Sequence, residues 1–207
     1  MDYIVLDMEW NQPWPGSPSS RKVLPVHIRG EIIQIGAVRV TEDQQVCDEF
    51  SIMIKPKYYR HLNRRVSKLT GIKESRLKAE GIPFAEAIER FRSWCGEDVV
   101  FLTWGFDDIT ILRENLQLHE LSYDWVDRWF NAQMMFNAQT DGSTAQKALK
   151  TAMEIFGIEA TRPAHPLDRQ VVQRPDDLQR PDRRLHQPEG SEDRHGDLRH
   201  RGQPPRP

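Results

Sequence analysis

The chain has 207 residues, which is enough for one domain of ordinary size with its own hydrophobic core. Hydrophobic residues make up 38% and charged residues 29%, and the formal net charge of -2 gives no whole-chain signal for nucleic acid. The apolar run at the N-terminus is broken by an acid after three residues, so we expect neither a signal peptide nor a membrane span, and we expect a cytoplasmic protein.

The first part of the chain has the pattern of β-strands. Residues 3–10 are apolar on both faces apart from two acids, which predicts a buried strand. Prolines and glycines mark residues 11–30 as a loop. The β-branched segment 31–40 predicts a second strand and residues 50–54 a third. Strands at this spacing predict an antiparallel meander.

Helical spacing begins in the middle of the chain. A helix is predicted from Pro83, a short apolar strand at 99–104, and a second helix from about Asp108. The residues expected to face the core from these two helices are Phe84, Ala87, Ile88, Phe91, Ile109, Leu112 and Leu116.

The last predicted helix begins at Ser143, where Ser143 and Gln146 fit a capping box, and Gly157 is its expected stop. After Ala160 the composition changes abruptly. The stretch 169–207 contains no aromatic residue, isoleucine, alanine or lysine, and it is rich in Arg, Pro, Asp, Gln and His. Such a segment buries too little apolar surface to offset its ordering entropy, so we expect a disordered tail.

The two cysteines, Cys47 and Cys95, form neither a disulfide framework nor a paired metal-ligand spacing. We expect two half-buried thiols in a reducing compartment.

Asp7 and Glu9 are the strongest local signal for chemistry. Side chains alternate along a strand, so both carboxylates project from one face. Inside an apolar strand they would repel each other unless a cation joined them, and oxygen-only ligands suit Mg²⁺ or Mn²⁺. The alternative is that the strand lies at a sheet edge and both acids are solvated.

A second signal follows the apolar strand at 99–104, where an acid stands between strand and helix, a position at which α/β sites are often built. For Asp107 the better interpretation is a helix N-cap. Asp108 is the candidate metal ligand. A third signal, the histidine of Ala164-His165, would on its own be a surface loop residue.

The segment 55–78 holds nine basic residues against one acid, Glu74, with Tyr58 and Tyr59 among them. This pattern favours contacts with backbone phosphates and base stacking, and a solvated helix–loop surface is the alternative. The basic residues selected as candidate substrate contacts are Arg64, Arg65 and Lys68.

Taken together, these residues resemble a family. Asp-x-Glu in the first strand, Ile-Gln-Ile-Gly-Ala-Val in the second, and the loop sequence at 69–72, Leu-Thr-Gly-Ile, are joined by Trp-Gly-x-x-Asp-x-x-x-Leu and the late Ala-His. Their order resembles the DEDDh exonucleases of the RNase T and proofreading-subunit superfamily, nearest the Eri-like and KapD-like branch. The resemblance covers residues 1–165.

The resemblance implies an α/β, RNase H-like fold, with a mixed central sheet of about five strands flanked by helices. It also implies that Asp7, Glu9 and Asp108 hold two Mg²⁺ or Mn²⁺ ions and that His165 is the general base. The implied activity is 3′–5′ exonucleolysis of single-stranded DNA or RNA, with release of nucleoside 5′-monophosphates and no membrane partner.

One element of the family pattern is missing. The last acid is expected five residues after the histidine, and that position is Gln170; Asp168 is a poor substitute because Pro166 precedes it. We therefore divide the chain into an exonuclease domain, 1–165, whose final helix is missing or altered, and a disordered tail, 166–207, whose composition is that of an out-of-frame read through GC-rich sequence. Two alternatives stay open: a catalytically impaired nucleic-acid binder and a phosphodiesterase for very short oligonucleotides.

Overall fold

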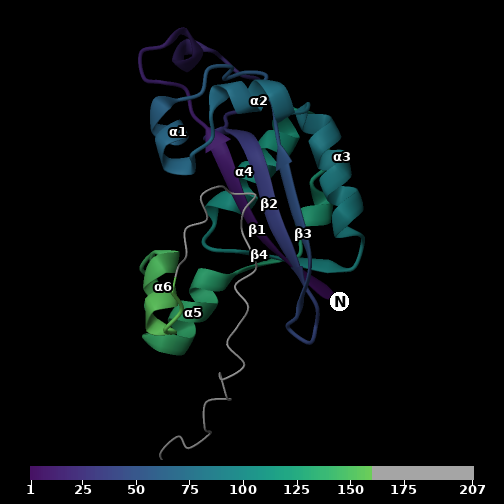
Figure 1. Ribbon diagram of the computed structural model, residues 1–207, viewed down its shortest axis with the longest axis vertical. Helices are drawn as coiled ribbons and strands as arrows, with labels where there is room; N and C mark the ends of the chain where they lie inside the picture. The colour runs from purple at the N-terminus through teal and green to yellow at the C-terminus, as the bar shows by residue number, and fades with distance from the viewer. Residues whose placement is uncertain (160–207) are drawn as a thin grey trace, which may run out of the picture. The chain divides into compact units, whose positions relative to one another are not determined.

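A computed structural model describes residues 1–159 of the chain. Its centre is a five-stranded sheet in the order β3-β2-β1-β4-β5 (Figure 1). The strands are β1 (Asp2–Asn11), β2 (Glu31–Val40), β3 (Val46–Met53), β4 (Val99–Thr103) and β5 (Trp129–Asn131). Pairing is antiparallel for β1 with β2 and for β2 with β3, and parallel for β1 with β4 and for β4 with β5. The mixed sheet and the antiparallel meander are therefore confirmed.

Helices cover the sheet and its ends. They are α1 (Arg64–Thr70), α2 (Glu74–Glu80), α3 (Phe84–Cys95), α4 (Asp107–Leu118), α5 (Ala132–Thr140) and α6 (Leu149–Ile155), with two 3₁₀ turns at Pro18–Arg21 and Asp124–Val126. No helix within residues 1–159 is long and apolar enough to cross a membrane.

The main core lies on the face of the sheet covered by α3 and α4. All seven helix residues predicted to face the core are buried there. A smaller cluster joins Ile33 of β2 and Met53 of β3 to Leu77 of α2. A register shift beside Glu9 lets Ile32 and Ile35, three positions apart on β2, both pack in the main core, while Ile33 packs in the smaller cluster.

β1 departs from the expectation of a strand buried on both faces. Ile4, Leu6 and Met8 are almost wholly buried in the main core, whereas Val5 on the other face is 40% exposed. Asp7 is exposed and Glu9 is half-buried. Within the described residues, the face that carries the two acids is therefore the more open one.

The capping box expected at Ser143 is wrong. α6 begins at Leu149, with Ala148 as its N-cap. The carbonyl of Lys147 accepts hydrogen bonds from the side chains of Trp104 and Gln133, at 2.8 and 2.5 Å, and these contacts hold the preceding residues as a loop. Gly157 does adopt a left-handed conformation after the helix, as expected of a stop.

The two cysteines differ, where we expected both to be half-buried. Cys47 is exposed at the start of β3, and Cys95 is wholly buried at the end of α3.

Candidate functional site

Asp7 and Glu9 lie on a central strand, with β2 on one side of β1 and β4 on the other. β1 is therefore not an edge strand of the sheet as a whole, but the exposure of Asp7 agrees with the solvated carboxylate of that alternative. The pairing with β4 ends at Val5, opposite Leu102. Beyond that point β1 continues alone on its β4 side.

Asp108 of α4 occupies this gap. Its Oδ1 accepts a hydrogen bond of 2.9 Å from the backbone N–H of Met8, between the two acids of β1. The Asp108 side chain is buried at 8% exposure. The first turn of α4 is thereby fixed to the strand that carries Asp7 and Glu9, and the Asp108 carboxylate lies near enough to Asp7 to be affected by its charge.

Burial is the first cause that raises the pKa of Asp108, to about 7, and the negative charge of Asp7 is the second. We expected desolvation at Asp7 and Glu9, but the carboxylate that burial affects most clearly is that of Asp108. A cation here would offset both effects, and a set of carboxylate oxygens suits Mg²⁺ or Mn²⁺. Among residues 1–159, however, no three His, Cys, Asp or Glu side chains converge closely enough to hold a metal by themselves. The donor set fits a divalent ion as part of a larger site.

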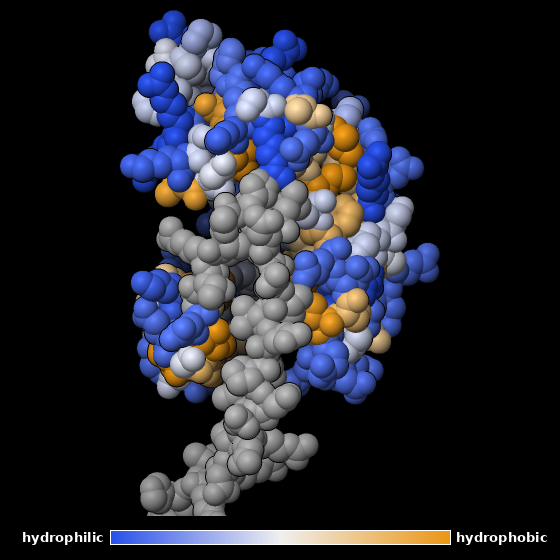
Figure 2. Space-filling view, in the orientation of Figure 1, coloured by the Kyte–Doolittle hydropathy of each residue, from blue (hydrophilic) through white to orange (hydrophobic). Residues whose placement is uncertain are grey.

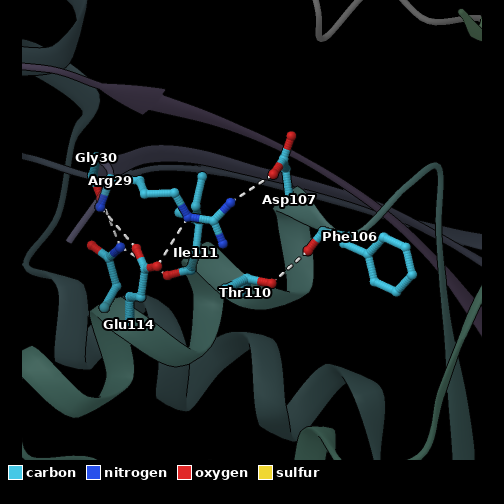
Figure 3. A network of polar contacts seen from close by, with 8 residues as sticks. Arg29, Gly30, Phe106, Asp107, Thr110, Ile111 and Glu114 are labelled. Carbon is cyan, nitrogen blue, oxygen red and sulfur yellow. Dashed lines mark hydrogen bonds and ion pairs between the residues drawn. The ribbon is translucent and has the colours of Figure 1, made fainter. Parts of the chain in front are cut away.

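Asp107 is not the N-cap that the sequence predicts. Phe106 holds that position, and Asp107 is the first residue of α4. The Asp107 carboxylate instead accepts from the guanidinium of Arg29 at 2.7 Å, and Arg29 also contacts Glu114 at 3.0 Å (Figure 3). Arg29 therefore ties the loop before β2 to two turns of α4.

The turn between β4 and α4 needs its glycine. Gly105 has a φ of 97°, which other residues rarely adopt. Its N–H donates to Oδ1 of Asn131 at 3.1 Å, and the same oxygen accepts from Gln133 in the first turn of α5. The position of Asp108 thus depends on the Trp-Gly turn and on the end of β5.

Arg64, Arg65 and Lys68 are all exposed on α1. The face shown in Figure 2 is largely hydrophilic over this helix. The Leu-Thr-Gly-Ile sequence at 69–72, expected in a loop, spans the last two residues of α1 and the turn that leads to α2.

Two buried polar side chains hold the segment before α1, and sequence analysis did not single out either of them. The amide of Asn11 donates to the carbonyls of Tyr59 and His61 and accepts from Asn63, at 2.7 to 3.0 Å. The carboxylate of Glu31 accepts from the backbone N–H groups of residues 57–59, at 2.5 to 3.0 Å. The two residues lie opposite each other at the same end of the β1–β2 pair, and polar residues at the point where one strand ends and the next begins are the signal that could have found them.

His165, Asp168, Gln170 and the expected tail lie outside the described residues. The general base, the fourth ligand and the division of the chain at residue 165 therefore remain predictions.

Comparison with known proteins bears on the whole described region. The family model for exonucleases of the RNase T type matches residues 4–165. A search of curated proteins found no match. Among solved structures, the nuclease domain of 3′hExo, a DEDDh family member bound to rAMP, has a TM-score of 0.66 at 21% identity, over 81% of this chain and 84% of that one.

Two further structures share the fold. Cell-death related nuclease 4 has a TM-score of 0.63 at 16% identity, over 79% of this chain and 57% of that chain. Exonuclease I, in the ExoI/SSB-Ct complex, has a TM-score of 0.59 at 15% identity, over 77% and 37%. With an RNase H-like sheet and a family-model match over residues 4–165, the chain belongs to the family of exonucleases of the RNase T type and is a nuclease.

Proposed function

We propose that the chain is a 3′–5′ exonuclease that hydrolyses single-stranded DNA or RNA to nucleoside 5′-monophosphates. The observation that carries the proposal is the hydrogen bond of buried Asp108 to Met8, which holds Asp108 against the strand that carries Asp7 and Glu9. The same fold occurs in a 3′-exonuclease described in 3′-end specific recognition of a histone mRNA stem-loop, at 21% identity. That neighbour supports a 3′ end as the substrate here.

Asp7, Glu9 and Asp108 would hold two Mg²⁺ or Mn²⁺ ions, together with groups outside residues 1–159. When bound, such ions activate a water and stabilise the entering and leaving oxygens of a phosphoryl displacement. His165 would accept the proton of that water, because an imidazole with a pKa near 6.5 is suited to this task. The exposed cations of α1 would hold the backbone phosphates of the strand. A cytoplasmic location also stays a prediction.

The test is an assay of the full chain on single strands of DNA and RNA labelled at the 5′ end, with and without Mg²⁺. We expect a ladder that shortens from the 3′ end, needs the divalent ion and disappears in Asp7→Ala. Asp107→Ala is the matched control, since Asp107 faces Arg29 and should leave cleavage intact.

The other outcomes identify the alternatives. Binding without cleavage would make the chain a catalytically impaired nucleic-acid binder, the result expected if the altered C-terminal part removes a ligand. Cleavage confined to dinucleotides would make it a phosphodiesterase for very short oligonucleotides. Normal cleavage by Asp7→Ala would refute the assignment of the acids.

A further inference from the structure

The basic stretch 55–78 does not form one surface. Arg64, Arg65 and Lys68 lie on α1, whereas Lys55, Lys57 and Arg60 line a separate cleft with Lys78 of α2. This cleft has a volume of about 660 Å³, and its walls also include Phe84 of α3 and His119 at the end of α4. Four cations thus surround one hollow.

The positive charge of the cleft is largely uncompensated within the described residues. Glu74 is the one acid in its lining, and its carboxylate contacts the ammonium of Lys78 at 2.7 Å. No ion pair involves Lys55, Lys57 or Arg60 within residues 1–159, and all three residues are exposed. An anion that entered the cleft would meet exposed cationic side chains, with Glu74 as the acid of the lining that competes for them.

The N-terminus of α3 lines the same cleft through Pro83, Phe84 and Ala85. Pro83 is the N-cap and provides no side-chain hydrogen bond to the first turn of this 12-residue helix. Helix N-termini attract anions because their first N–H groups lack intrahelical acceptors. The N–H groups of this turn add hydrogen-bond donors at the cleft, beside Glu86 in the same turn and the C-terminal end of α4 at His119.

His119 gives the cleft an aromatic wall. Its ring stacks on Phe84 at 4.5 Å and meets the edge of Tyr58 at 5.6 Å. Its Nε2 atom is buried and has no hydrogen-bond partner in the described structure. Burial, and then the charge of Lys57, lower the pKa of His119, which favours the neutral form of the ring. Because Phe84 is buried, the cleft offers exposed positive charge over an apolar floor, which suits the phosphates of a single strand rather than stacking of its bases.

The cleft and the acids lie at opposite ends of α4. Asp108 and His119 are 11 positions apart on this helix, and at about 1.5 Å per residue they are separated by roughly 17 Å. A stacked strand advances about 3.4 Å per phosphate, so that span corresponds to about five nucleotides.

We propose that this cleft is an upstream phosphate-binding site, which holds the backbone of the single strand about five nucleotides from the 3′ end being cut. The proposal rests on the proposed function for its substrate. The cleft would be a second binding site for the strand, separate from α1. Only a strand long enough to reach the cleft would contact it.

The experiment compares binding of oligothymidylates of about three and about twelve nucleotides by fluorescence anisotropy, with a chelator present so that nothing is cut. The test variant is Lys55→Gln/Lys57→Gln, in which the backbone contacts of both residues are retained. Arg92→Gln/Lys150→Gln removes two exposed charges elsewhere and is the matched control. Thymidine 5′-monophosphate is titrated in parallel.

We expect the test variant to lose about tenfold in affinity for the long strand and none for the short one, with the slope of log affinity against log salt smaller by about 1.4. Equal losses for the long strand, the short strand and the mononucleotide would overturn the proposal in favour of a free-nucleotide site. Losses no larger than those of the control would overturn it outright. Cleavage by the wild-type chain in Mg²⁺ reports separately on the proposed function.

Discussion

The backbone N–H of Met8 and the carboxylate of Asp108 are joined by a hydrogen bond of 2.9 Å, across 100 positions of sequence. The bond fills a place where β1 has lost its pairing with β4. It satisfies a buried backbone donor and draws a carboxylate toward Asp7, whose charge it would otherwise avoid. The same hydrogen bond therefore satisfies a backbone donor of β1 and holds the Asp108 carboxylate near Asp7.

Replacing Asp108 with asparagine should stabilise the metal-free chain at neutral pH by about 1–3 kcal/mol. Asparagine keeps an oxygen for Met8 and removes the buried charge that faces Asp7. Thermal melts in a chelator measure the effect. Asp107→Asn is the control, since it loses only an exposed ion pair with Arg29 and should melt level or slightly lower. A drop in melting temperature for Asp108→Asn would show that the charged carboxylate contributes stability.

Asn11→Ala should destabilise the chain by about 2–3 kcal/mol, because it leaves the carbonyls of Tyr59 and His61 and the N–H of Asn63 without their partner. It should also weaken nucleic-acid binding by loosening α1. Chemical denaturation and a binding titration check both effects. Gln12→Ala, an exposed neighbour, should change stability by less than about 0.5 kcal/mol. Equal effects of the two variants would mean that Asn11 is not an anchor.

Neutralising Arg64, Arg65 and Lys68 together should weaken single-strand binding and reduce its salt slope by about 2, as three phosphate contacts are lost. Unlike the cleft variant, this one should affect short and long strands alike, because α1 lies next to the segment tied to β1. Binding titrations at several salt concentrations decide the matter. An unchanged slope of log affinity against log salt would mean that these three side chains of α1 do not contact phosphates.

The titration of Cys95 should lower the free energy of unfolding as the pH rises into the alkaline range. Burial raises the pKa of its thiol to about 12, so the folded state keeps the proton after the unfolded chain has lost it. Stability from this group is therefore full below about pH 8.5 and falls by about 1.4 kcal/mol per pH unit above it, until the folded thiol ionises. Denaturation of Cys95→Ala should lack this component of the pH dependence. Identical pH profiles for the two proteins would contradict the assignment.

A thiol reagent gives an independent measure of the same burial. Cys47 is exposed and should react in the native chain, whereas Cys95 should react only after denaturation. Mass spectrometry should accordingly show one adduct before unfolding and two after it.

Long, strongly patterned elements could be predicted from the sequence. The bounds of β2 agree with the predicted 31–40, and the apolar faces of α3 and α4 are the ones expected. α1 and α2 have seven residues each, so apolar spacing barely repeats within them, and neither was predicted. Asn63, which caps α1, and Gly71, with a φ of 75° after it, were the available local signals.

The strand that carries Asp7 and Glu9 could be predicted because its residue spacing is local. The partners of Asp107 and Asn11 could not, because each pairs with a residue about 50 or more positions away. At Ser143 the local pattern fits a helix start, but no helix forms there. Side chains of Trp104 and Gln133 donate to the Lys147 carbonyl and hold the segment as a loop. Local sequence patterns thus predicted candidate residues, whereas their hydrogen-bond partners are set by tertiary contacts.

Asn11 and Glu31 contact only backbone atoms of the segment that leads into α1. The path of this segment consequently does not depend on its own side chains, apart from the need for N–H groups that proline would remove. The side chains at positions 57, 58 and 60 can therefore change while the backbone geometry of the segment is kept. Divergence within the family can then retune how tightly a strand is held without rebuilding the part of the molecule that cuts it.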